Sequence, residues 1–272
     1  MPSRNLTKAV ILARGLGKRM RDETAGVPLS PDQASVANTG LKAMIPIGRP
    51  FLDYVISALG DSGFTDVCVV IGPEHDSVRR HYEREAQPVR VRIAFAIQQE
   101  PLGTADAVVA AEEFTGSDPF ALLNSDNYYP AAALSVLRTE SPPAIVGFAR
   151  SSLLKGNVSS DRVTRFGALE VDADGFLRRI VGDPESARAS TGGEIYASMN
   201  CWGFTEEIFG WCREVPASAR GELELTQAVQ RAIDLGKMEF RAILLRETVL
   251  DMSERVDIAR MAERLAGVRV SL

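Results

Sequence analysis

The strongest constraint on this chain is a short apolar run that leads directly into a turn with two glycines, within residues 8–20. Residues 9–13 are apolar and rich in β-branched side chains, which predicts a strand buried on both faces, as central strands of parallel sheets are. Gly15 and Gly17 have no Cβ, so the turn can be tight and its amides can approach an anion closely. Two cations, Lys18 and Arg19, follow at once. The turn therefore predicts a phosphate site.

An ordinary strand-to-helix turn with solvated charges would have the same residues, and the turn by itself leaves both interpretations open. It lacks the Gly-Lys-Ser/Thr ending of a P-loop. It also lacks the third glycine of the dinucleotide-binding fingerprint. The turn therefore belongs to neither of these two common phosphate-binding motifs.

The composition is that of an ordinary globular protein, with 45% hydrophobic and 25% charged residues among 272. A net charge of −5 gives no general footprint for nucleic acid. No signal peptide is visible, and every apolar run is far shorter than the roughly 20 residues of a membrane span. We therefore expect a cytoplasmic protein without nucleic-acid or membrane partners. Cys68 lies in an apolar run and is expected to be a reduced core thiol.

Strands alternate with helices in the first half, which predicts a doubly wound α/β sheet. The second half has the pattern of a mixed extension that shares the same core. We predict an α/β, Rossmann-like doubly wound mixed sheet with a smaller lobe, in one domain of residues 1–272 with halves at 1–150 and 151–272. Further strands are expected at 66–71, 91–97, 118–123, 144–149, 163–171, 175–181, 194–204, 240–245 and 248–250. Helices are expected at 51–59, 74–85, 105–113, 131–138, 206–212, 223–235 and 254–265.

Residues 21–40 are polar and rich in Pro, Gly, Ser and Asp, so we expect a structureless loop there. A loop of this length is usually functional or disordered, and its place after the glycine turn suits a mobile flap over a ligand. His75 and His81 lie in a polar helical stretch, and both are expected at the surface.

Two charged residues next to apolar runs, Asp126 and Lys42, are candidates for ligand binding. Asp126 comes just after the strand expected at 118–123, and ligands of open α/β sheets bind at the carboxyl ends of strands. An acid there is suited to Mg²⁺, although an Asx turn or a helix cap uses the same residue types. Lys42 stands among apolar residues, where the alternative is a surface lysine with a partly buried stem.

These pieces, in this order, resemble the sugar-phosphate nucleotidylyltransferases, which include the glucose-1-phosphate thymidylyl-, uridylyl- and guanylyltransferases. Residues 12–19 match the family opening Leu-Ala-x-Gly-x-Gly-x-Arg, with Arg14 at a variable place. Lys42 matches the lysine of the family's Pro-Lys, although leucine replaces the proline. Gln98 and Gly103 match its base-contacting pair.

Further matches extend nearly to the end of the chain. Asp126 matches the acid of Gly-Asp-Asn/Val, with serine in place of the glycine, and Asp251 lies where the family has its second metal ligand. Residues 166–167 resemble the Tyr-Gly sugar contact, Asn200 resembles the Asn-x-Gly/Trp strand, and residues 221–226 resemble Gly-Glu-x-x-Leu-Thr. One departure is clear: residues 178–184 lack the lysine of Glu-Lys-Pro, which meets the sugar phosphate in most members.

The resemblance implies transfer of a nucleotidyl group from a nucleoside triphosphate to a sugar or cyclitol 1-phosphate, with Mg²⁺ as cofactor and pyrophosphate as the second product. It assigns catalytic roles to Arg19 and Lys42 and metal binding to Asp126 and Asp251. Nucleotide binding falls to Leu12, Ala13, Gly15, Gly17, Gln98, Gly103 and Thr104, and sugar-phosphate binding to Gly167, Arg179 and Asn200. Arg179, or its neighbour Arg178, is the expected substitute for the missing lysine.

Two other functions stay open. The same fold could take a non-sugar acceptor such as phosphocholine, or the chain could be a catalytically silent regulatory subunit that binds a nucleotide sugar. The missing lysine and Ser125 favour the silent subunit, whereas the intact cations and acids favour an enzyme. The nucleobase and the assembly into a homo-oligomer also stay open.

Overall fold

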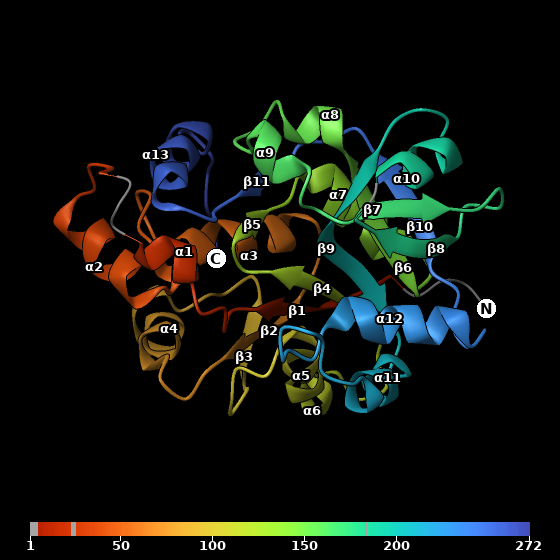
Figure 1. The fold of residues 1–272 in the computed structure, drawn as a ribbon. Helices are drawn as coiled ribbons and strands as arrows, with labels where there is room; N and C mark the ends of the chain where they lie inside the picture. The colour runs from red at the N-terminus through yellow and green to blue at the C-terminus, as the bar shows by residue number, and fades with distance from the viewer. Residues whose placement is uncertain (1–4, 23–25, 183) are drawn as a thin grey trace.

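The computed structural model describes residues 5–22, 26–182 and 184–272. Within these residues the strands are β1 (Lys8–Leu12), β2 (Asp66–Ile71), β3 (Arg92–Ile97), β4 (Phe120–Asn124), β5 (Asn127–Tyr128), β6 (Ala144–Ala149), β7 (Ala168–Val171), β8 (Leu177–Val181), β9 (Tyr196–Phe204), β10 (Arg241–Leu245) and β11 (Leu250–Asp251). Nine of them form one sheet, with the order β10-β6-β9-β4-β1-β2-β3 and the hairpin β7–β8 attached to β9 (Figure 1). Strand β9 runs antiparallel to β4 and β6, so the sheet is mixed.

Helices cover both faces of this sheet. One face carries α3 (Phe51–Asp61), α7 (Ala131–Thr139) and α13 (Arg255–Arg264), and the other carries α5 (Thr104–Ala110), α11 (Ile208–Glu214) and α12 (Leu225–Asp234). Figure 1 shows the second group beneath the strands. The shorter helices are α1 (Lys18–Arg21), α2 (Pro31–Thr39), η1 (Lys42–Met44), α4 (Asp76–Arg80), η2 (His81–Ala86), α6 (Glu112–Thr115), α8 (Arg150–Leu153), α9 (Ser160–Val163) and α10 (Pro184–Ser190).

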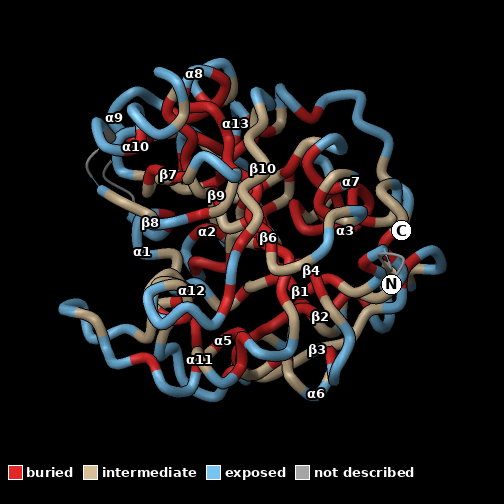
Figure 2. The backbone as a smooth tube through the Cα atoms, turned by 90° about the vertical axis from the view of Figure 1, so that its right-hand side faces the viewer, coloured by how far each residue is buried: buried red, intermediate tan, exposed pale blue. Residues whose placement is uncertain are grey.

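The central strands contribute to two hydrophobic cores, one on each side. In β1, Ala9 and Ile11 pack into one core and Val10 into the other, because successive side chains of a strand point to opposite faces. Cys68 of β2 is a buried free thiol, as expected. Figure 2 shows the buried strands β1, β4 and β6 at the centre of the molecule. The α/β class and the doubly wound mixed sheet are thus confirmed.

Strands from both halves of the chain share the sheet, with β1 to β4 and β6 from the first half and β7 to β10 from the second. The division at residue 150 stays a prediction. No helix among the described residues is long and apolar enough to cross a membrane.

The prediction of a structureless loop at residues 21–40 was wrong for the second half of that range. Helix α2 fills Pro31–Thr39, and the Ser30 hydroxyl and the Gln33 side chain cap its start reciprocally. Serine before proline is an ordinary helix-start signal, which the polar composition of the stretch concealed. Residues 23–25 of the same stretch lie outside the described residues.

Two further expectations needed correction. The first strand of the hairpin begins at Ala168, because α9 and a turn occupy the start of the predicted segment. The histidines are not simple surface residues, since the side chains of His75 and His81 are only 15% and 13% exposed. His81 Nε2 lies 2.9 Å from Oδ1 of the fully buried Asp53, so this ring is a partner for a buried charge.

Candidate active site

The candidate site lies where the direction of the strand order changes. Strands β2 and β3 extend to one side of β1, and β4 lies on the other side. Crevices at the carboxyl ends of strands beside such a change are the usual ligand sites of α/β sheets. Two adjoining pockets of about 430 and 200 Å³ open there, and Gly15, Lys42 and Thr104 line both of them.

Glycines hold the first turn against the segment that carries Lys42. Gly17 has φ 56°, and a Cβ on it would lie 2.2 Å from the carbonyl oxygen of Gly40. Gly40 has φ 79°, and a Cβ on it would lie 2.6 Å from the carbonyl oxygen of Leu16. The two backbones therefore touch only because both residues are glycine. This contact brings the start of η1, and with it Lys42, to the carboxyl end of β1.

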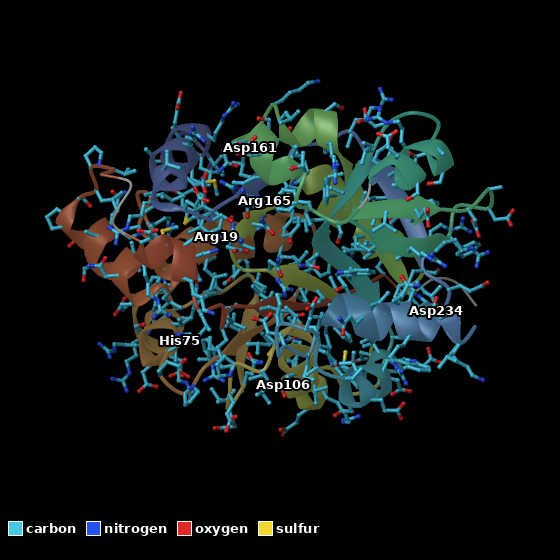
Figure 3. All side chains as sticks on the ribbon, in the orientation of Figure 1. Arg19, His75, Asp106, Asp161, Arg165 and Asp234 are labelled. Carbon is cyan, nitrogen blue, oxygen red and sulfur yellow. The ribbon has the colours of Figure 1, made fainter. Side chains whose placement is uncertain are left out.

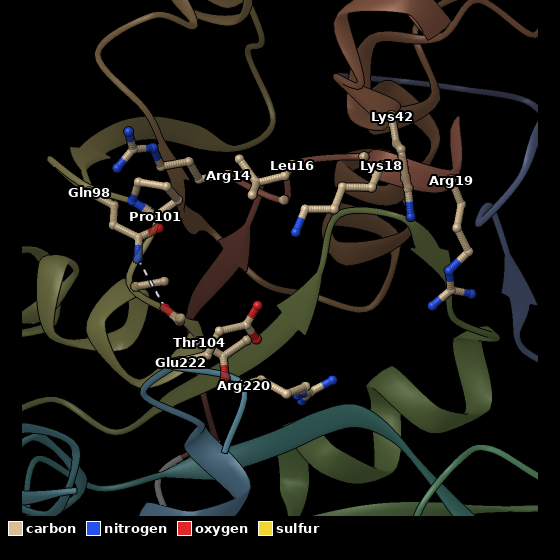
Figure 4. A pocket seen from close by; sticks show the side chains of 14 residues that line it. Arg14, Leu16, Lys18, Arg19, Lys42, Gln98, Pro101, Thr104, Arg220 and Glu222 are labelled. Carbon is tan, nitrogen blue, oxygen red and sulfur yellow. Dashed lines mark hydrogen bonds between the residues drawn. The ribbon is translucent and has the colours of Figure 1, made fainter. Parts of the chain in front are cut away.

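Cations gather at one end of the larger pocket. Lys18, Arg19 and Lys42 lie together at this end in Figure 4, and Arg220 lines the pocket from another wall. Figure 3 shows Arg19 on the opposite side of the sheet from Asp106, which lies on α5. Helix α1 is a single turn and is too short to attract an anion by its own dipole. The cationic side chains and the amides of the glycine turn are therefore the groups that would attract phosphate.

Lys42 connects the segment packed against the glycine turn to the candidate metal ligands. Its Nζ donates to Asp126 Oδ2 at 2.9 Å. Burial lowers the pKa of the Lys42 ammonium, but the charge and hydrogen bond of Asp126, with Asp251 behind it, offset this and leave the pKa raised. Lys42 is therefore a charged ammonium at neutral pH, held between the two pockets.

The opposite end of the larger pocket is formed around Gln98, which is 4% exposed. Its Nε2 donates to the carbonyl oxygen of Gly103 at 3.0 Å and to Asp106 Oδ2 at 2.8 Å. Both partners are acceptors, so the amide nitrogen must face them. The Oε1 atom of Gln98 is left as the acceptor that faces the pocket (Figure 4).

The loop after Gln98 is joined to the segment before α12. Gly103 has φ 131°, and a Cβ on it would lie 2.4 Å from the carbonyl oxygen of Leu223. That oxygen accepts from the Ala105 amide at 2.9 Å, and the Leu223 amide donates to Leu102 at 2.8 Å. This pairing brings Arg220 and Glu222 to the pocket wall.

The two candidate metal ligands, Asp126 and Asp251, lie close together although they are far apart in the chain. The short antiparallel pair β5–β11 sets Asp251 opposite Asn127, and the Met252 amide donates to the carbonyl oxygen of Asp126 at 2.8 Å. Burial raises the pKa of the Asp251 carboxyl, and the negative charge of Asp126 raises it further. The two carboxylates thus repel each other, and a cation between them would relieve that repulsion.

Asp251 already has partners among the described residues. Its Oδ1 accepts from Asn127 Nδ2 at 2.9 Å, and its Oδ2 accepts from Arg162 and from Ser253. Asp126 Oδ2 accepts from Lys42, and the Asp126 side chain is 26% exposed. The described residues contain no cluster of three His, Cys, Asp or Glu side chains for a metal. One or two carboxylates completed by substrate phosphates is nevertheless the usual environment of Mg²⁺, so this donor set fits the ion.

Most of the predicted site residues line these pockets. They are Leu12, Ala13, Gly15, Gly17, Arg19, Lys42, Gln98, Gly103, Thr104 and Asp126. The predicted sugar-side residues Gly167 and Asn200 line neither pocket. Asn200 lies on β9 with the left-handed φ of 53°, and the carbonyl of Gly167, just before β7, accepts from the Ser198 amide of β9 at 2.9 Å.

The predicted substitutes for the missing lysine lie away from the pockets. Arg178 pairs with Asp172 of its own hairpin at 2.5 Å, and Arg179 is exposed on β8. The structure therefore does not bring either arginine to the cations at the glycine turn. Lys18, a cation of the predicted phosphate turn, lines the larger pocket. The pockets are also lined by residues to which the sequence prediction gave no binding role, namely Arg14, Leu16, Gly40, Pro101, Ala107, Asn124, Ser125, Arg220 and Glu222. Arg220 and Glu222 adjoin or belong to a matched motif, which was the available signal for them.

A family profile described as "Nucleotidyl transferase" matches residues 8–247. This chain belongs to the nucleotidyl transferase family. A glucose-1-phosphate thymidylyltransferase of Streptomyces antibioticus is 30% identical over 84% of this chain and 58% of its own length. A UTP–glucose-1-phosphate uridylyltransferase of Haloferax volcanii is 28% identical over 85% of each chain.

Solved structures share the fold of this nucleotidyl transferase family member. A UTP-bound UGPase from Acinetobacter baumannii has a TM-score of 0.73 at 17% identity, over 97% of this chain and 95% of that one. An inositol-1-phosphate CTP transferase from T. maritima has a TM-score of 0.71 at 17% identity, over 98% and 99%. The chain spans 58% of the length of two of its curated relatives.

Proposed function

We propose that this protein transfers a nucleotidyl group from a nucleoside triphosphate to a sugar or cyclitol 1-phosphate and releases pyrophosphate. The observation that carries the proposal is the polarity of the larger pocket. Lys18, Arg19 and Lys42 stand at one end, and the Gln98 amide oxygen stands at the other. A nucleoside triphosphate has the same polarity, with a polyanion at one end and a hydrogen-bonding base at the other.

The reaction needs little covalent chemistry from the protein. An ionised oxygen of the sugar phosphate attacks the α-phosphorus, and the bond from that phosphorus to the α,β-bridging oxygen breaks. Pyrophosphate then leaves with the bonding electron pair. Because the second pKa of a phosphomonoester is near 6, the attacking oxygen is mostly ionised at neutral pH and needs no general base. Neither histidine lines the described pockets, which agrees with this chemistry.

The protein's own task is to hold two anions together and to stabilise the leaving group. Such transfers are catalysed mainly by positioning and electrostatics. The amides of Gly15 and Gly17, with Arg19, would hold the β- and γ-phosphates, and Lys42 would face the α-phosphate. Arg220 on another wall is suited to the acceptor's phosphate, in place of the absent lysine.

Members of the family typically use Mg²⁺. In this chain Asp126 would hold the ion directly, with Asp251 beside it. The ion would offset phosphate charge as the two substrates meet. We also propose that the two halves of the chain bind different substrates. Residues 1–150 would bind the nucleotide, and residues 151–272 would bind the sugar phosphate.

The direct test is a screen of nucleoside triphosphates against sugar and cyclitol 1-phosphates, with phosphocholine as the non-sugar acceptor. Pyrophosphate release is measured for each pair. The proposal expects release that depends on both substrates. If phosphocholine is the single acceptor that supports pyrophosphate release, the enzyme uses a non-sugar acceptor. If the protein binds nucleotide but releases no pyrophosphate with any acceptor, it is a silent subunit.

A further inference from the structure

An arginine with unused donors lies in the wall of the larger pocket. The Arg14 side chain is only 7% exposed, and it lines the pocket at the end that holds Gln98 (Figure 4). Its contacts with the Glu74 carboxylate, from Nε and Nη2, are both long, at 3.4 Å. Its Nη1 is buried and has no hydrogen-bond partner within the part of the chain that the structure describes. A buried guanidinium donor without an acceptor is costly, so this one is suited to an acceptor that arrives with a ligand.

The backbone makes room for this arginine. Gly72 follows β2, and a Cβ on it would lie 2.5 Å from Arg14 Nε and 2.4 Å from Glu74 Oε2. The Arg14–Glu74 pair therefore lies directly against the backbone at position 72, and a side chain there would require the pair to shift. Arg14 also stands at the variable place of the glycine turn, so the turn does not require an arginine there for its own geometry.

Next to this donor stands an acceptor whose orientation is fixed. Gln98 Nε2 is held by the Gly103 carbonyl and the Asp106 carboxylate, so its amide cannot rotate without leaving both bonds unmade. The pocket end consequently offers a positive donor, Arg14, and a neutral acceptor, Gln98 Oε1. A complementary base carries an oxygen acceptor beside an N–H donor.

This inference rests on the proposed function and specifies the nucleotide for it. We infer that Arg14 and Gln98 select bases with a carbonyl oxygen next to a ring N–H, namely uracil, thymine and guanine, over cytosine and adenine. In the selected bases the ring N–H donates to Gln98 Oε1, and the carbonyl oxygen accepts from Arg14. In cytosine and adenine the ring nitrogen is an acceptor, so it cannot form a hydrogen bond with the acceptor Oε1. Their exocyclic amine is a donor, so it cannot form one with the guanidinium.

The experiment compares UTP with CTP, because uracil and cytosine differ only along this edge. Dissociation constants are measured by calorimetry with Mg²⁺ and without acceptor, so that no turnover occurs. Wild type should bind UTP about tenfold or more tightly than CTP, the range expected for a good pair of base contacts. Arg14→Met should bring the two constants within about threefold, mainly by weakening UTP. The exposed Arg84 gives the matched control, and Arg84→Met should keep the wild-type ratio.

A second variant keeps the inference testable if Arg14→Met does not fold. Asp106→Ala removes one of the two acceptors that fix Gln98, so the amide can turn its nitrogen to the pocket and CTP should gain affinity. A wild type that prefers CTP or ATP would overturn the inference, as would an unchanged ratio in folded Arg14→Met. If pyrophosphate is released with CTP as the best donor, the proposed function stands and this inference fails. If no nucleoside triphosphate binds, both fail.

Discussion

Replacing Lys42 with methionine removes a cation but keeps most of its carbon chain. In the wild type its Nζ lies 2.9 Å from Asp126 Oδ2, and the two side chains are 19% and 26% exposed. A partly exposed pair of this kind contributes about 1 kcal/mol or less to folding, so the melting temperature should change little. The same cation facing a phosphate in the transition state contributes about 3–5 kcal/mol, which predicts a loss of two to four powers of ten in turnover.

The assay for this prediction is the rate of pyrophosphate release at saturating substrates, with a melting curve on the same preparation. Lys155→Met is the matched control, since Lys155 is exposed and lines neither pocket. The control should keep wild-type turnover. A folded Lys42→Met protein whose turnover stays within a few-fold of wild type would refute the role given to Lys42.

The remaining predictions concern the metal, the acceptor and the effect of pH. Asp126→Asn should raise the Mg²⁺ concentration needed for half-maximal activity by about tenfold or more, and full activity in excess chelator would contradict a metal at this acid. Arg220→Ala should raise the KM for the sugar phosphate about tenfold and leave the KM for the nucleotide unchanged. Arg179→Ala should change neither KM. If Arg179→Ala and not Arg220→Ala raises the KM for the sugar phosphate, Arg179 is the residue that binds the acceptor's phosphate. The hydrogen bond with Asp53 raises the pKa of His81 above its ordinary 6.5 despite partial burial, so the stability it contributes is complete below pH 6.5 and is lost as the pH rises through the raised pKa. Urea unfolding should show this loss in wild type and not in His81→Gln, and identical pH slopes would exclude it.

Much of the sheet was predictable from the sequence because its strands are buried on both faces. Continuous apolar runs such as those of β1 and β2 have few other uses in a chain of this composition. The start of β7 was not predictable in this way, since the segment before it is short, polar and irregular. Helix α2 was missed for a related reason: it buries only Ala37, so it has little of the apolar periodicity that indicates a helix.

The candidate site was predictable residue by residue, but its assembly was not. Asp126 and Asp251 each follow an apolar run, yet the β5–β11 pair that joins them has two residues on each side. A pair that short leaves no periodic pattern. The partners that engage Asp251 were equally hidden, because Arg162 comes from a one-turn helix distant in sequence. The contact between Gly17 and Gly40 likewise depends on backbone proximity, which residue types alone do not specify.

The central claim is tested most directly by the identity and the amount of both products. Purified protein is incubated with Mg²⁺, a nucleoside triphosphate and a sugar or cyclitol 1-phosphate, and the mixture is resolved by mass spectrometry beside a pyrophosphate assay. The account predicts a nucleotide sugar and pyrophosphate in equal amounts, with neither formed when the acceptor is omitted. Pyrophosphate without a nucleotide sugar, or no product across the whole panel of acceptors, would contradict it.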